Sequence, residues 1–220
     1  SLKWKKLAAA QGHAKAQHGL GWLYYSGEGG VTIDYKAAFK WVKLAAEQGQ
    51  IGAQSILGEL YGDGKGVSRD LRQSVKWFSH AAERGFSLAQ YNLGVIYQTG
   101  KGVPQDYEAA AKWYTRAAKQ GAVEAQFQLG KAYSVGRGLK KNNVIAHMWF
   151  NIAASRGHDG AKTMRGSIEK MLAPTDISTA QKLARECSQN NYKDCAIEER
   201  HQLKSSQTLI SPIGSNKVVN

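Results

Sequence analysis

A repeat of about 36 residues constrains the fold of this chain more than any other feature of its sequence. Tryptophan recurs with spacings of 37, 36, 36 and 36 residues, at Trp4, Trp41, Trp77, Trp113 and Trp149. An Ala-Ala pair follows each tryptophan by four or five residues, and a glycine comes three residues after each pair. Self-similarity at a fixed period of about 20–50 residues is typical of solenoids, propellers and other repeat arrays.

Two further columns lie between the tryptophans. The first reads Leu-Gly-x-x-Tyr and the second reads Gly-x-Gly, and each occurs four times. Their members are Leu20-Gly21 to Tyr24, Leu57-Gly58 to Tyr61, Leu93-Gly94 to Tyr97, Leu129-Gly130 to Tyr133, and Gly27/Gly29, Gly64/Gly66, Gly100/Gly102 and Gly136/Gly138. The one 37-residue spacing has a local cause, because Gly30 is an extra residue in the first of these loops.

Each unit is predicted to be two short helices joined by glycine turns. Ala53, Leu57 and Leu60 have the spacing of one apolar stripe on a first helix, here called helix A. The Gly-x-Gly turn ends helix A, where a left-handed residue is needed. The second helix, helix B, is predicted to bury Trp77 and Ala81 and to stop at a further glycine. Its predicted N-caps are Asp34, Asp70, Asp106 and Asn142, whose side-chain oxygens can accept from orphan backbone N–H groups.

Gly58 lies inside helix A, where glycine costs about 1 kcal/mol relative to alanine. Because a glycine recurs at this place in four units, we expect a close approach of a neighbouring helix to offset that cost. One helix pair cannot bury its apolar face alone, whereas stacked pairs can. The sequence therefore predicts an all-α fold, a right-handed alpha-alpha superhelix (solenoid) of 36-residue helix-turn-helix units.

The predicted organisation follows the columns from one end of the chain to the other. Residues 1–12 form the second helix of a truncated preceding repeat, 13–49 repeat 1, 50–85 repeat 2, 86–121 repeat 3, 122–157 repeat 4, 158–195 the C-terminal capping helices and 196–220 an extended tail.

The column pattern AxxxLGxxYxxGxGVxxDxxxAxxWxxxAAxxG resembles the Sel1-like repeat family, a bacterial type of TPR-like helical repeat. Repeat 3, AQYNLGVIYQTGKGVPQDYEAAAKWYTRAAKQG, is similar to the family pattern almost throughout, and the resemblance covers roughly residues 1–172. In repeat 4, Leu139 and Asn142 replace the usual Val and Asp and keep their physical roles. The resemblance implies an adaptor or assembly protein, often exported, and names no ligand.

Both ends of the predicted stack differ from its middle. Residues 1–12 match helix B alone, so Trp4 and Leu7 have an uncovered face. The chain has no starting Met, and we expect either missing upstream residues or a second chain, as in a homo-oligomer, to cover that face. At the other end, Arg165 replaces the buried leucine. A final helix is predicted from about Asp176 to Cys187, with Thr175 as its N-cap.

The variable positions of helix A are the predicted partner-binding surface, since the repeated positions are used by the fold. Helix A usually lines the concave side of a helix-pair solenoid, and Trp and Tyr are enriched in binding hot spots. The candidate residues are His18, Trp22, Tyr25, Glu59, Tyr91, Val95, Gln98, Phe127 and Lys131. We predict a groove that binds a peptide segment or a helix of another protein. The alternative for Tyr91 and Phe127 is that they fill gaps between adjacent units.

The net charge of +13 favours an acidic partner, whether a protein, an anionic glycan or nucleic acid. The basic residues are scattered along both helices and match no nucleic-acid motif, so nucleic-acid binding is not predicted. A polyanion-binding or glycan-binding module remains an alternative function. No apolar run approaches the length of a membrane span, so no spanning segment is predicted.

Cys187 and Cys195 are the only cysteines and flank the end of the last predicted helix. An even count at this place favours a disulfide that pins the C-terminal cap, and free thiols in a cytosolic protein are the alternative. A disulfide indicates an oxidising compartment. Together with the often exported family, it favours a periplasmic or secreted bacterial protein, with a cytoplasmic location as the alternative. Two cysteines are too few for structural zinc and no His pairs, so neither a metal site nor a cofactor is predicted.

One string has the form of a catalytic motif. Ser167-Ile-Glu-Lys170 fits Ser-x-x-Lys, the nucleophile motif of penicillin-binding folds. Neither Ser-Asp-Asn nor Lys-Thr-Gly accompanies it, and the repeat predicts a different fold. We therefore predict a non-catalytic protein and an exposed polar face at Ser167, with a hydrolase of cell-wall or β-lactam substrates as an alternative.

Overall fold

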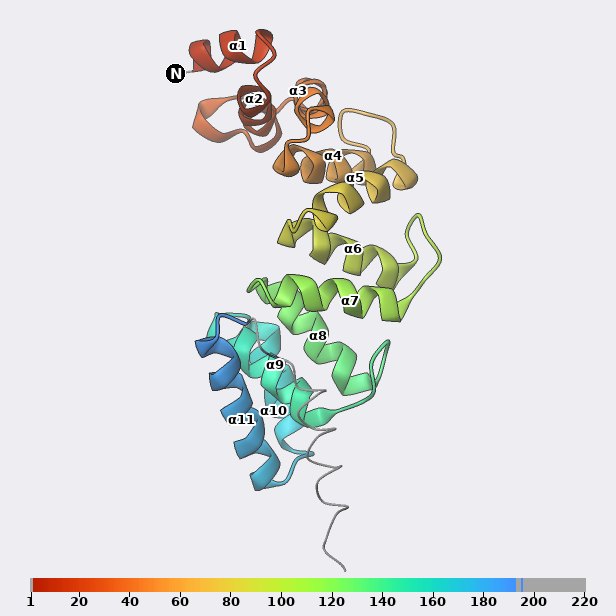
Figure 1. The fold of residues 1–220 in the computed structure, drawn as a ribbon, viewed down its shortest axis with the longest axis vertical. Helices are drawn as coiled ribbons and strands as arrows, with labels where there is room; N and C mark the ends of the chain where they lie inside the picture. Colours follow the sequence, from red (N-terminus) through yellow and green to blue (C-terminus); the bar gives the residue numbers. More distant parts are fainter. Residues whose placement is uncertain (1, 193–194, 196–220) are drawn as a thin grey trace, which may run out of the picture.

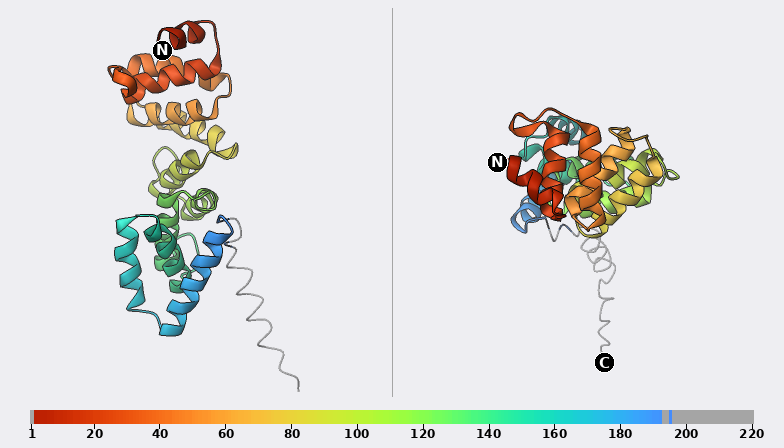
Figure 2. Two further views of the ribbon diagram at one scale, coloured as in Figure 1. Left: turned by 90° about the vertical axis from the view of Figure 1, so that its left-hand side faces the viewer. Right: turned by 90° about the horizontal axis from the view of Figure 1, so that it is seen from above.

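The computed structural model describes residues 2–192 and 195, which form an elongated stack of helices (Figure 1). Eleven α-helices follow one another along the long axis, and the described residues contain no β-strand. Most helices pack mainly against the helices before and after them in the sequence, whereas the last two both pack on the ninth. Figure 2 shows the stack from the side and from above, with successive helix pairs turned about the long axis. The all-α solenoid predicted from the repeat is confirmed.

A and B helices alternate along the chain. The A helices are α2 (Ala14–Ser26), α4 (Ile51–Asp63), α6 (Ser87–Thr99), α8 (Val123–Val135) and α10 (Asp159–Glu169). The B helices are α1 (Leu2–Ala10), α3 (Tyr35–Glu47), α5 (Leu71–Glu83), α7 (Tyr107–Ala118), α9 (Asn143–Ser155) and α11 (Pro174–Gln189). A short 3₁₀ turn, Glu28–Gly30, lies in the first loop, which holds the extra glycine.

The caps of both helix types form as predicted. Gly64 ends α4 with a φ of 72°, and its N–H donates to the carbonyl of Leu60. This left-handed residue satisfies one of the carbonyls that a helix end leaves unpaired. The side chains of Asp34, Asp70, Asp106 and Asn142 each accept a hydrogen bond from a backbone N–H two or three residues later.

The second glycine docks the turn on the preceding unit in three of the four Gly-x-Gly turns, at Gly66, Gly102 and Gly138. A Cβ atom on Gly138 would overlap the carbonyl group of Tyr107, the first residue of α7, and one on Gly66 would overlap that of Tyr35. Both glycines have a φ of 72°. Only glycine fits here, because it combines a left-handed backbone with the absence of a side chain.

The glycine inside helix A marks the predicted close approach of a neighbouring helix, and that prediction is confirmed. A Cβ on Gly58 would lie 2.9 Å from the ring of Phe78, and one on Gly130 would lie 2.7 Å from the ring of Phe150. The prediction that Trp77 is buried is wrong, because Trp77 is half-buried while Phe78 is only 5% exposed. Trp77 packs against the apolar cluster that α3 and α4 share, and Phe78 enters the space that Gly58 leaves.

A ladder of buried glutamines links the units, and the sequence analysis missed it. The Nε2 atoms of Gln17, Gln54, Gln90 and Gln126 donate to the carbonyls of Ala9, Ala46, Ala82 and Ala118 at 3.1, 3.3, 3.0 and 3.2 Å. Each accepting carbonyl lies near the end of the preceding helix B, where carbonyl groups lack partners within the helix. The glutamine therefore joins each helix A to the helix B before it.

The final helix α11 packs on α9 and closes the C-terminal end of the stack. It begins at Pro174 with Ala173 at the N-cap, so the predicted start at Asp176 with Thr175 as the cap is wrong. Proline is favoured in the first turn because it lacks the N–H that would be unpaired there, and its fixed φ suits a helix.

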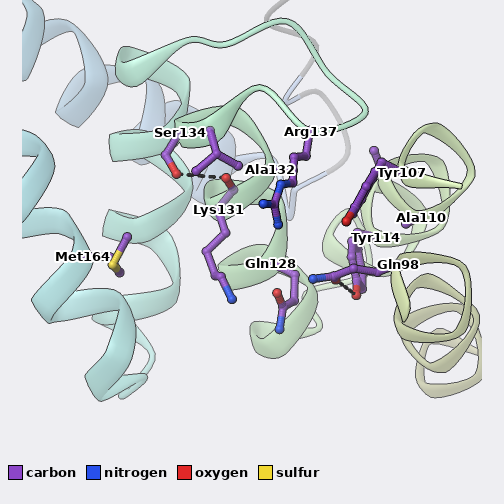
Figure 3. A pocket seen from close by; sticks show the side chains of 12 residues that line it. Gln98, Tyr107, Ala110, Tyr114, Gln128, Lys131, Ala132, Ser134, Arg137 and Met164 are labelled. Carbon is purple, nitrogen blue, oxygen red and sulfur yellow. Dashed lines mark hydrogen bonds between the residues drawn. The ribbon is translucent and has the colours of Figure 1, made fainter. Parts of the chain in front are cut away.

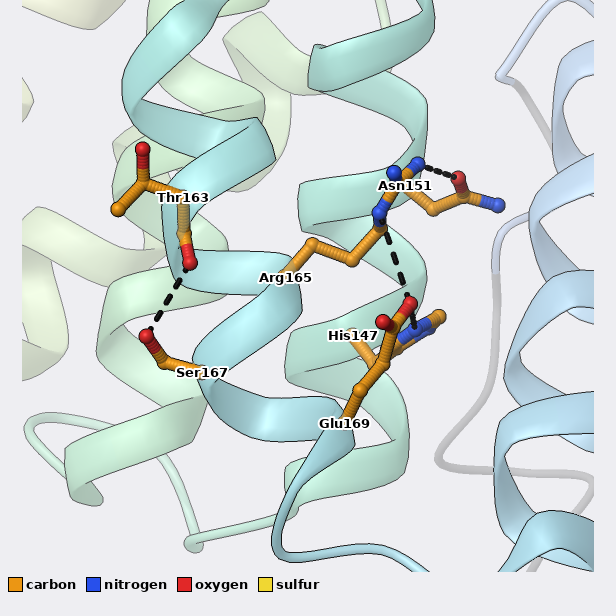
Figure 4. A network of polar contacts seen from close by, with 6 residues as sticks. All are labelled: His147, Asn151, Thr163, Arg165, Ser167 and Glu169. Atoms are coloured by element: carbon orange, nitrogen blue, oxygen red, sulfur yellow. Dashed lines mark hydrogen bonds and ion pairs between the residues drawn. The ribbon is translucent and has the colours of Figure 1, made fainter.

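A polar network joins α9 to α10 inside this cap (Figure 4). His147 is fully buried, and its Nε2 donates to Glu169 Oε1 at 2.9 Å. Arg165 donates to Asn151 Oδ1 at 2.9 Å, and its Nε lies 3.6 Å from Glu169 Oε1. Arg165 occupies the column that holds a buried leucine in the four preceding units. Its paired charge gives α10 the more polar surface that a capping helix needs.

The N-terminal helix α1 has the uncovered face that the sequence predicts. Trp4 is 67% exposed and Leu7 is 49% exposed, because no helix of the described residues covers that face. The predicted extended tail, residues 196–220, lies outside the described residues.

Cys187 and Cys195 form the predicted disulfide, with their Cα atoms 5.0 Å apart. Both side chains are buried in the apolar cluster that α9 and α11 share. The bond therefore ties the chain after α11 back to the core of the cap.

Reducing this disulfide is expected to lower the free energy of unfolding by about 2–3 kcal/mol, because the closed loop restricts the unfolded chain. Urea unfolding with and without a thiol reductant measures the difference. The control is Cys187→Ser/Cys195→Ser. Its free energy of unfolding should equal that of the reduced wild type and should not change when the reductant is added. An unchanged wild-type midpoint after reduction would contradict the prediction.

Candidate partner-binding site

The nine residues predicted to bind a partner lie on four consecutive A helices. Trp22 is exposed and the other eight are half-buried, so each keeps some accessible surface. His18, Trp22 and Tyr25 are on α2, Glu59 is on α4, Tyr91, Val95 and Gln98 are on α6, and Phe127 and Lys131 are on α8. Their surroundings differ from one unit to the next.

Tyr25 packs against the next unit. Its hydroxyl donates to Glu59 Oε2 at 2.8 Å, and the ring of Trp22 lies 5.7 Å away. Lys65 Nζ lies 6.0 Å from the centre of the Tyr25 ring. Burial, and then the Glu59 carboxylate, raise the pKa of Tyr25. Burial also raises the pKa of Glu59, although the hydrogen bond from Tyr25 opposes that shift. Tyr25 and Glu59 therefore form a bridge between α2 and α4.

Tyr91 and Phe127 occupy the same column of successive units, and their rings fill spaces between helices. The ring of Phe127 stacks on His158 with 4.2 Å between centres, and the ring of Tyr91 lies 6.0 Å from that of Tyr114. His18 occupies the same column on α2, and burial lowers its pKa. This column supplies contacts between units and leaves only ring edges accessible.

Gln98 and Lys131 line a pocket of about 190 Å³ between α6, α7 and α8 (Figure 3). Small side chains from α7 and α8 form its apolar wall, together with Met164 from α10. Figure 3 shows the Arg137 side chain extending from the turn after α8 towards Tyr107, and the Lys131 side chain extending from α8 to a place beside Gln128. The hydroxyl of Tyr114 donates to Oε1 of Gln98 and fixes that amide at the pocket wall.

An equivalent pocket of about 300 Å³ lies one unit earlier, between α4, α5 and α6. Eight of its lining residues precede lining residues of the first pocket by 36 positions: Gly62, Leu71, Ser74, Phe78, Asn92, Val95, Ile96 and Lys101 correspond to Gln98, Tyr107, Ala110, Tyr114, Gln128, Lys131, Ala132 and Arg137. Tyr25 occupies the position of Gly62 one further unit back, where its side chain bridges to Glu59. The pockets are therefore a property of the repeat.

The two pockets differ in charge. Glu59, Asp63, Arg69 and Lys101 line the pocket between α4 and α6, so both signs are present there. The pocket between α6 and α8 is lined by Lys131 and Arg137 and by no carboxylate. The sequence analysis placed Lys131 on this face but did not include Arg137. The middle residue of Gly-x-Gly was the available signal, because Lys65, Lys101 and Arg137 occupy it in three consecutive units.

The catalytic-looking string has an ordinary helical environment. Ser167 is exposed on α10, and its hydroxyl donates to the carbonyl of Thr163 at 3.1 Å (Figure 4). Within residues 2–192 and 195, no group of three or more His, Cys, Asp or Glu is placed to hold a metal ion. None of the described helices is long and apolar enough to cross a membrane.

A family model for the Sel1 repeat matches residues 14–50, 51–86, 87–121 and 123–158. A search of the curated proteins found no match. Among solved structures, a protective antigen present in uropathogenic Escherichia coli strains, with an SLR fold, is 32% identical with a TM-score of 0.79, covering 100% of this chain and 45% of that chain.

A Sel1 repeat protein from Oxalobacter formigenes is 37% identical with a TM-score of 0.68 and covers 76% of this chain. A third structure, a Klebsiella pneumoniae protein, is 22% identical with a TM-score of 0.50, covers 76% of this chain and 83% of that chain, and shows the fold alone. The chain spans 45% and 48% of the lengths of the first two proteins.

Proposed function

This chain belongs to the Sel1 repeat family, whose members generally act as protein-interaction scaffolds, and on that premise we propose that it is a non-catalytic adaptor. Its A-helix face holds a segment of another protein. The observation that carries the proposal is the pair of equivalent pockets one unit apart on that face, because a segment lying along it can place successive side chains in them.

The partner lies along α4, α6 and α8. Val95 and Gln98 line these pockets together with Glu59 and Lys131, so four of the nine candidate residues take part directly. Trp22 adds an exposed aromatic ring beyond the Tyr25 bridge. The remaining candidates, His18, Tyr91 and Phe127, pack between the units and hold this face in shape.

The adaptor works in the periplasm or outside the cell. Two observations support this location. The disulfide between Cys187 and Cys195 suits an oxidising compartment. The E. coli relative is described as a protective antigen, and that description fits this location.

Site-specific photo-crosslinking tests the proposed function. A photoreactive amino acid replaces Gln128 in the pocket wall or, as the matched control, Lys112 on the exposed surface of α7. We expect Gln128 to crosslink a discrete protein in cells of the source organism and Lys112 to give no such product. Equal labelling from both positions, or none from either, would refute the scaffold.

A further inference from the structure

We propose that the pocket between α6, α7 and α8 binds an acidic side chain of the partner segment, held between Lys131 and Arg137. The inference rests on the proposed function and names the chemistry that the face selects. Four observations support it: unpaired cations, pocket size, the charge of the neighbouring pocket, and the closed end of the groove.

Lys131 and Arg137 have no carboxylate partner among the residues that the structure describes. Each lies over an aromatic ring instead, Lys131 Nζ 5.5 Å from the Phe127 centre and Arg137 Cζ 5.5 Å from the Tyr107 centre. Cation–π contacts hold a charged group in place without neutralising it. Two positive charges are therefore positioned beside one pocket and remain available to a carboxylate.

The size of the pocket favours a side chain over a free small molecule. Its volume of about 190 Å³ is below the roughly 300–1,000 Å³ typical of small-molecule sites. Ala110, Ala111 and Ala132 give it an apolar wall. An aliphatic stem can pack on this wall while its carboxylate meets the cations at the rim.

The neighbouring pocket argues against a long polyanion. Glu59 and Asp63 line that pocket together with Arg69 and Lys101, so a uniformly negative polymer continuing along the face would meet mixed charge there instead of a continuous positive track. Binding of single-stranded nucleic acid uses a positively charged groove that follows the backbone. A protein segment can change sign along its length. The segment therefore carries its acidic residue at α8 and a basic or neutral residue at α4.

The bridge from Tyr25 to Glu59 limits where the segment can lie. Tyr25 occupies the position that Gly62 holds one unit later and Gln98 holds two units later. Gly62 has no side chain to fill that position and Gln98 lines the pocket there, whereas the Tyr25 side chain fills it. The corresponding space between α2 and α4 is therefore occupied by the protein itself. This leaves the acid-binding pocket as the basic end of a groove that starts at α4.

A random-peptide phage library selected on the full chain tests the inference. We expect bound peptides to share an acidic position beside an apolar one, enriched at least about tenfold over the unselected library. Selection on Lys131→Gln/Arg137→Gln should lose that acidic position, because charge-assisted hydrogen bonds to the carboxylate are removed. The matched control, Lys76→Gln/Lys112→Gln, removes the same charge from exposed positions on α5 and α7 and should retain it.

The outcomes separate this inference from the scaffold itself. Peptides without an acidic position that still compete with the Gln128 crosslink would overturn the inference and leave the scaffold standing. Acidic peptides retained equally by both double variants would show general attraction to a basic protein, which also overturns it. If no peptide is enriched and no crosslink forms, both proposals fail.

Discussion

Replacing Gly138 with alanine is expected to lower the free energy of unfolding by about 2–5 kcal/mol. The left-handed backbone at Gly138, with a φ of 72°, costs a residue with a Cβ about 1–2 kcal/mol. The new methyl would also overlap the carbonyl group of Tyr107, and overpacking of this kind typically costs about 1–3 kcal/mol. Urea unfolding followed by circular dichroism measures the total.

Gly29 provides the control for the first prediction, because it occupies the same column in the first unit. Its φ is 65°, and a Cβ there would meet no atom within 4 Å. Gly29→Ala therefore has the backbone strain without the overlap, and its free energy of unfolding should fall by only about 1–2 kcal/mol. Equal losses in the two variants would mean that the turn does not dock on the preceding unit.

The second prediction concerns the fit between Gly130 and Phe150. Phe150→Ala should lower the free energy of unfolding by about 3–5 kcal/mol, since the ring is fully buried. Gly130→Ala should lower it by about 1–2 kcal/mol, because the methyl would lie 2.7 Å from that ring, although alanine favours the helix. The loss in the double variant should be at least about 1 kcal/mol smaller than the summed losses of the two single variants, since the alanine methyl enters the space that the ring vacates.

Gly166 supplies the control for the cycle. It occupies the same column in α10, and a Cβ there would have no atom within 4 Å. Gly166→Ala should therefore raise the free energy of unfolding by up to about 1 kcal/mol through helix propensity alone. Strict additivity of Gly130→Ala and Phe150→Ala would show that the two residues do not share one packing site.

The fold could be predicted because its determinants recur in the sequence. The aspartate caps and the turn glycines act through local backbone geometry, which repeats with every unit. The choice between Trp77 and Phe78 could not be made in the same way. Each helix of a solenoid packs against helices on two sides, so its apolar surface is wide and adjacent apolar residues both fit the periodicity.

Other details required contacts between units. The glutamine ladder was missed because a polar side chain is normally expected at the surface, and its carbonyl partners lie on another helix. Of the predicted partner-binding residues, Gln98 and Lys131 line a pocket, and the binding of a partner there stays a prediction. Arg137 lies in a turn, and sequence alone did not place that turn beside α7. The role of Tyr25 depended on Glu59, which is 34 residues away.

The nearest-neighbour packing of the stack gives unfolding a direction. Helix α9 packs against α8, α10 and α11, whereas α1 packs mainly on α2. A molecule pulled from its N-terminal end would therefore peel away helix by helix while the C-terminal end stays assembled. The pocket between α6, α7 and α8 begins at α6, so several helices could detach before it loses a wall. A partner bound at that pocket, as proposed, would therefore tolerate the loss of the helices before α6.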